Sequence, residues 1–108
     1  MKFVNLTPHA INIYNSEKQL VMTVPPSGAV ARVQAQRKLS AVYDGIEIYR
    51  TQYGEIENLP PPEPDTIFIV SGLVAVAAKD RDDVLQPGEL LRSDSGQPIG
   101  CVGLQKGG

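Results

Sequence analysis

Apolar and polar side chains alternate along much of the first half of the chain, which is typical of β-strands that bury one face. Residues 10–14 alternate with a period of two, and the apolar run 20–24 follows after a polar turn at 15–18. We expect these two segments to pair as a hairpin. The prolines and glycine at 25–28 end the second strand, because proline cannot donate a hydrogen bond to a neighbouring strand and glycine permits a turn.

Two further strands and a connector are predicted before residue 66. Alternation resumes over residues 29–34, whereas residues 37–43 are too short to distinguish a helix from a strand. Asp44-Gly45 is a strong turn signal in front of a fourth strand over residues 46–50. Residues 60–65 are too rich in proline for a helix or a central strand. They predict a stiff extended connector, which could alternatively recruit a proline-binding partner.

The remaining residues predict a buried strand, a short helix and a final hairpin. Residues 66–70 are a run of apolar β-forming side chains, typical of a central strand that is buried on both faces. The alanine-rich segment 71–79 follows directly, with Ser71 placed to cap a helix. Residues 89–92 and 98–104 predict the hairpin, joined through a turn that contains glycine.

These elements predict one α+β domain that spans residues 1–108. It has a mostly antiparallel sheet of about six or seven short strands and one short helix after a central strand. Residues 60–65 are the proline-rich connector and residues 105–108 are expected to form a flexible tail. Of the 108 residues, 42% are hydrophobic and 20% are charged, which is ordinary for a globular protein.

Charge and cysteine content narrow the class of protein. The formal net charge is −2 and no basic cluster exceeds two residues, so binding to duplex nucleic acid is disfavoured. The single Cys101 cannot form an internal disulfide, which fits a reducing compartment. No signal-peptide pattern and no apolar run of about 20 residues is present. We therefore expect a cytoplasmic protein without a membrane partner.

No complete catalytic constellation is visible, so binding is favoured over chemical conversion. The only histidine, His9, has no second metal ligand and no placed nucleophile. Asp82 and Asp83 are adjacent and should point to different sides, which is poor geometry for a shared reaction. We expect no catalytic residues, no metal site and no cofactor.

Arginines, aromatics and a helix start provide the candidate ligand chemistry. Guanidinium groups suit phosphates that must be held with defined geometry, and an aromatic ring can stack on a base. A helix start after a buried strand presents free amide groups that suit a phosphate, although a plain N-cap is the more usual role of a residue such as Ser71. Each arginine could also form an ordinary surface ion pair. The candidate ligand-binding residues are Arg32, Arg50, Tyr53, Ser71, Arg81 and Asp83.

Several short motifs together resemble a group of small proteins carried by phages and prophages. The motifs are Asn5-Leu6-Thr7-Pro8-His9, Pro26-Ser27-Gly28 with Ala31-Arg32-Val33, Tyr53-Gly54 with Leu59-Pro60, Ile69-Val70-Ser71 and Arg81-Asp82-Asp83. Within that group the chain is most similar to the phage anti-Thoeris sponge proteins of the first-described kind. The resemblance covers nearly the whole chain, but it carries over no individual ligand-binding residue.

The resemblance implies a non-catalytic sponge that binds cyclic ADP-ribose isomers, and in some members cyclic oligonucleotides, and holds them without cleavage. It also implies a homodimer that can assemble into a hexamer, acting in the cytoplasm of an infected bacterial host. Two other classes of function stay open. One is a small phage structural or morphogenesis protein that pairs through its sheet edges. The other is a metal-dependent nucleotide-processing enzyme that uses Asp82 and Asp83.

Overall fold

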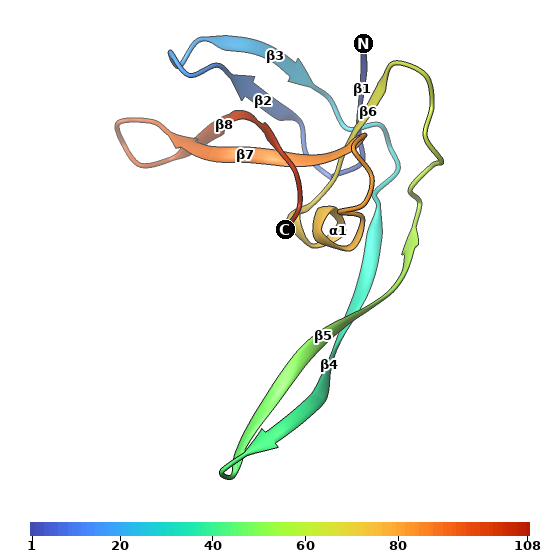
Figure 1. Ribbon diagram of the computed structural model, residues 1–108. Coiled ribbons are helices and arrows are strands. Elements are labelled where there is room, and N and C mark those ends of the chain that lie inside the picture. Colours follow the sequence, from blue (N-terminus) through green and yellow to red (C-terminus); the bar gives the residue numbers. More distant parts are fainter.

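The computed structural model describes all 108 residues and divides them into a body and a projecting arm (Figure 1). Six strands form one sheet in the order β1-β6-β7-β8-β2-β3, and β4 pairs only with β5. The molecule measures 51 × 37 × 21 Å along its principal axes, because the β4–β5 hairpin, here called the arm, extends away from the sheet. The elements are β1 (Lys2–Asn5), β2 (Ile11–Tyr14), β3 (Leu20–Val24), β4 (Arg32–Tyr43), β5 (Ile46–Glu57), β6 (Thr66–Ile69), α1 (Gly72–Ala77), β7 (Val84–Arg92) and β8 (Pro98–Gln105).

The α+β class is confirmed, with eight strands instead of six or seven. Antiparallel pairing joins β2 to β3, β4 to β5 and β7 to β8, and these pairs include most of the paired positions. Parallel pairing joins β1 to β6, β6 to β7 and β2 to β8. The added strand is β1, a four-residue edge strand, so the strand predicted to be central, β6, is the second of the sheet.

The body has a core on each face of β6. Phe68, and Val70 directly after the strand, belong to a cluster that also contains Leu6 and, from α1, Val74 and Ala75. Ile69 belongs to a second cluster. Successive residues of a strand point to opposite faces, so β6 is buried on both sides as the sequence predicts. The second cluster includes the buried Cys101, Ile11, Ile13 and Val24.

The arm is longer than the sequence pattern indicates. The ambiguous residues 37–43 continue the predicted third strand as part of β4, and β5 runs on to Glu57. Asp44 and Gly45 both have positive φ, 51° and 80°, as a two-residue turn of the type favoured in hairpins requires. The connector that follows β5 contains no helix or strand over residues 60–65.

The C-terminal residues contact the body. Gln105 is the last residue of β8, and the Lys106 ammonium lies 2.6 Å from an Asp82 carboxylate oxygen. Gly107 lies so close to the backbone of Ala75 in α1 that a Cβ atom would collide with it. Gln105 thus belongs to the sheet, and the flexibility expected of residues 105–108 stays a prediction. The helix α1, with six residues, is too short to span a membrane.

Candidate functional site

A cavity of about 670 Å³ lies in the angle between the base of the arm and the body. Its walls come from the turn after β1, from the ends of β4 and β5 nearest the body, and from the start of α1. In Figure 1 these parts meet beside α1, where the arm leaves the body. The polar residues of the lining are Thr7, Arg32, Gln34, Glu55, Glu57 and Ser71.

Arg32, one of the candidate ligand residues, lines this cavity and has no partner within the chain. It is the first residue of β4, and the buried Ala31 before it anchors the strand by donating its amide to the Leu6 carbonyl (3.0 Å). In register Arg32 stands opposite Glu57, yet the two form no ion pair and the guanidinium makes no hydrogen bond. Opposed strand residues share a face, with Cβ atoms about 5 Å apart. Neither charged group is therefore engaged by a side-chain partner in this structure.

A β-bulge interrupts the arm at the cavity. The register passes from Val33 opposite Ile56 to Ala35 opposite Tyr53, so Gln34 faces the two residues Gly54 and Glu55. Such a bulge bends the strand and redirects its side chains, and bulges are frequent beside functional sites. Gln34, Gly54 and Glu55 all line the cavity, so the irregularity shapes its wall.

Ser71 lines the same cavity, but its side chain also caps the helix. Its hydroxyl accepts a hydrogen bond from the Val74 amide (3.5 Å), as the predicted N-cap should. With only six residues in α1, the helix dipole adds little field at this end. We therefore assign Ser71 to the wall of the cavity and build no anion site on the helix start.

A side-chain network around Asn5 shapes another wall, and the sequence motif that begins at Asn5 did not predict this role. Asn5 is 1% exposed; its amide nitrogen donates to the carbonyls of His9 (2.7 Å) and Val24 (3.0 Å). Its side-chain oxygen accepts from the amide (2.9 Å) and the hydroxyl (2.6 Å) of Thr7. This network fixes the turn that contributes Leu6, Thr7 and the following proline to the cavity.

Two other candidates lie outside the cavity on the arm. Tyr53 lines a shallow neighbouring hollow of about 140 Å³ that shares Gln34 and Gly54 with the cavity. Arg50 is further along the arm, opposite Lys38, and makes no ion pair. Tyr53 is therefore beside the site, whereas Arg50 is separate from it.

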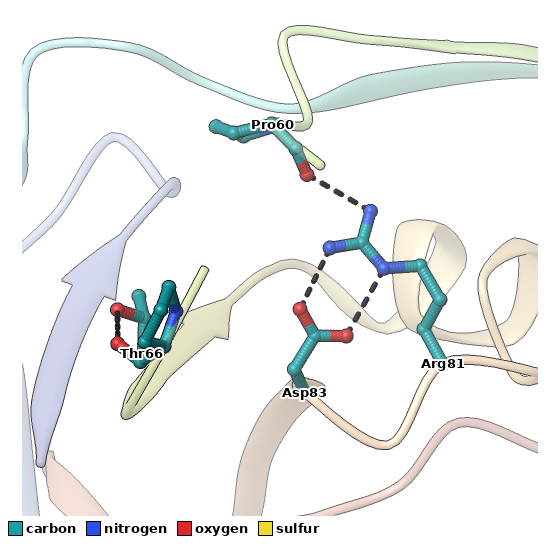
Figure 2. Close-up of polar contacts among 5 residues, drawn as sticks. Pro60, Thr66, Arg81 and Asp83 are labelled. Atoms are coloured by element: carbon teal, nitrogen blue, oxygen red, sulfur yellow. Dashed lines mark hydrogen bonds and ion pairs between the residues drawn. The ribbon is translucent and has the colours of Figure 1, made fainter. Parts of the chain in front are cut away.

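Arg81 and Asp83 form a different structure, a clamp on the connector (Figure 2). Arg81 donates hydrogen bonds to both carboxylate oxygens of Asp83 (3.0 and 2.7 Å) and to the Pro60 carbonyl (2.9 Å). Its guanidinium also lies 5.9 Å from the centre of the Phe68 ring. The hydrogen bond from Arg81 lowers the pKa of the Asp83 carboxyl, because it stabilises the charged form. Neither residue lines the cavity.

The acidic residues after α1 do not converge. Asp82 forms an ion pair with Lys106 and Asp83 forms one with Arg81, so the two carboxylates of this turn bind different partners. No group of three or more histidine, cysteine, aspartate or glutamate side chains is placed to hold a metal ion.

Sequence reasoning found two residues of the cavity, Arg32 and Ser71, and missed Glu55 and Glu57. The two glutamates are two positions apart in a strand, which gives them a common face, but the same spacing occurs on any solvated strand. Comparison of the chain with protein-family models, with curated proteins and with solved structures finds no significant match.

Proposed function

We propose that this chain is a non-catalytic, phage-encoded sponge that binds cyclic nucleotide immune signals in the infected bacterial host. Cyclic ADP-ribose isomers are the primary ligands and cyclic oligonucleotides are further candidates, as the resemblance implies. The observation that carries the proposal is a cavity of about 670 Å³ lined by an arginine without an internal partner. Ligand held there is withdrawn from the defence system without being cleaved.

The size and chemistry of the cavity suit such a ligand. Small-molecule pockets are typically about 300–1,000 Å³ and combine an apolar wall with a few placed polar groups. The apolar part of the lining includes Leu73, which is 46% exposed and offers a surface to a base, above the buried Leu6 and Val74. Arg32 offers a guanidinium fork to a phosphate, and Gln34 adds an amide group.

We propose that the protein acts as a homodimer, which can assemble further into a hexamer, and that the arm is the principal contact. Large apolar side chains are exposed on both faces of its distal half. Tyr43 and Ile46 are opposed on one face (66% and 64% exposed), and Leu39 and Tyr49 are opposed on the other (56% and 43%). A two-stranded hairpin without packing is marginally stable in water. A second copy that covers the arm would bury its apolar side chains and so stabilise the hairpin.

The first test is ligand depletion. Purified protein is incubated with cyclic ADP-ribose isomers and cyclic oligonucleotides, the solution is assayed for remaining ligand, and the protein is then denatured. Recovery of the depleted molecule intact by mass spectrometry is the expected result. Absence of depletion at micromolar protein would refute the sponge, and recovery of a cleaved molecule would support the metal-dependent enzyme instead.

A second candidate function, a phage structural or morphogenesis protein, is favoured by the same exposed arm. The two outer strands of the sheet, β1 and β3, are joined only at one end by the bridge between Asn5 and Pro26, and Leu20 and Val21 on β3 are exposed. Unpaired edges and apolar patches are common sites of protein association. Strong assembly without depletion of any nucleotide would support this function.

A further inference from the structure

Two glutamates among the lining residues are unusual in a site that receives phosphates. Glu55 and Glu57 both line it, and neither forms an ion pair or a side-chain hydrogen bond. Near a phosphate each would be repulsive and would weaken binding. Their presence therefore calls for ligand groups that a carboxylate can bind.

A carboxylate can only accept hydrogen bonds, so it selects hydroxyl or amine donors. Vicinal hydroxyls of a ribose match its two oxygens, and acidic side chains commonly bind ribose hydroxyls in dinucleotide sites. We infer that Glu55 and Glu57 are specificity residues that bind ribose hydroxyls while Arg32 binds phosphate. This inference rests on the proposed nucleotide-binding function and adds the part of the ligand that these glutamates select.

The geometry brings the two kinds of group into one small space. Arg32 and Glu57 are opposed across the β4–β5 pair, and Glu55 is placed beside them by the bulge opposite Gln34. A phosphate and a ribose of one nucleotide are adjacent groups, so a single small ligand can contact both. A compact polyanion without hydroxyl donors meets the repulsion of the glutamates with no compensating hydrogen bond.

The test compares three probes, cyclic ADP-ribose and two deoxy counterparts, on the unmodified protein and three variants by isothermal titration calorimetry. The probes are cyclic ADP-ribose and its counterpart in which both hydroxyls of one ribose are replaced by hydrogen; each ribose is tested in turn. The proteins are the unmodified chain, Glu57→Gln and Glu55→Gln. Glu17→Gln is the control, since it removes the same charge from an exposed turn outside the cavity.

We expect the unmodified protein to prefer cyclic ADP-ribose over one deoxy probe by about 10–100-fold, the usual range for a hydrogen bond to a charged group. In Glu57→Gln or Glu55→Gln that preference should shrink to within about threefold, because affinity for cyclic ADP-ribose falls and repulsion of the deoxy probe is relieved. Glu17→Gln should retain the full preference.

The outcomes separate the inference from the proposed function. If the unmodified protein binds cyclic ADP-ribose and both deoxy probes equally well, the inference is wrong and the sponge proposal stands. The inference is also wrong if both glutamine variants keep the full preference. If no probe binds, both the inference and the assignment of cyclic ADP-ribose as a ligand fail.

Discussion

Arg81 donates two hydrogen bonds to Asp83, two residues further along the chain, and a third to the Pro60 carbonyl. The pair therefore joins the end of the helical segment, the start of β7 and the connector that follows the arm (Figure 2). Both side chains are mostly shielded, with exposed fractions of 25% and 19%.

Replacement of Arg81 by alanine should lower the free energy of unfolding by about 1–3 kcal/mol, because the Asp83 carboxylate and the Pro60 carbonyl lose their partner. Urea unfolding monitored by circular dichroism measures this. Arg50→Ala is the matched control and should change stability by less than about 0.5 kcal/mol, since Arg50 forms no ion pair. Equal effects of the two variants would contradict the role of the clamp.

The same clamp should make stability depend on acid pH. The hydrogen bond from Arg81 lowers the pKa of Asp83 in the folded state, so the unfolded state binds the proton more tightly. The stabilisation is complete above the unfolded pKa of about 4 and is lost as pH falls through the lower folded pKa. Unfolding free energies measured from pH 6 to pH 2 should fall less steeply for Asp83→Asn; an unchanged slope would exclude this contribution.

Arg32→Gln should weaken binding of cyclic ADP-ribose by about 10–100-fold, because the phosphate loses a charge-assisted hydrogen bond. Stability should stay unchanged, since Arg32 has no internal partner. Equilibrium dialysis measures the affinity, and Arg50→Gln, which removes an arginine outside the cavity, should bind as the unmodified protein does. If both variants lose affinity equally, the loss is due to the lower positive charge of the whole protein and not to a contact in this cavity.

Tyr43→Ser with Ile46→Ser should convert the proposed dimer into monomers at micromolar concentration, because it removes one exposed apolar face of the arm. Sedimentation velocity measures the change. Leu20→Ser on β3 removes a comparably exposed side chain from the body and should leave the dimer intact. If Leu20→Ser dissociates the dimer and the arm variant does not, the dimer contact lies at the β3 edge of the sheet and not on the arm.

Local signals were sufficient for the hairpins and the helix. The polar turn before Leu20, the Asp44-Gly45 turn and the Ser71 cap each act over a few residues, and the structure confirms all three. The length of the arm was missed for a physical reason. Its distal half exposes apolar groups on both faces, so no alternating pattern marks it as a strand with one buried side.

Long-range relationships were not available from the sequence. The parallel pairs of β1 with β6 and of β2 with β8 join residues that have no common turn signal. For the same reason spacing could not show that Arg32 and Ser71 share a cavity, or that Arg81 and Asp83 lie outside it. An arginine and an aspartate two residues apart can bind a ligand or each other, and only the fold distinguishes these cases.

The pairing of β2 with β8 joins strands from opposite ends of the chain, so this part of the sheet can close only after β8 has been synthesised. The β2–β3 hairpin is complete by Val24, but its other edge stays unpaired until Cys101 and Val102 have been synthesised. The arm, by contrast, pairs through a two-residue turn within residues 32–57, although its base at Val33 and Ile56 packs against a core that β6 and α1 complete later. During translation an apolar hairpin edge and the arm are therefore both exposed before the sheet can close, and this interval is when the nascent chain is most open to aggregation.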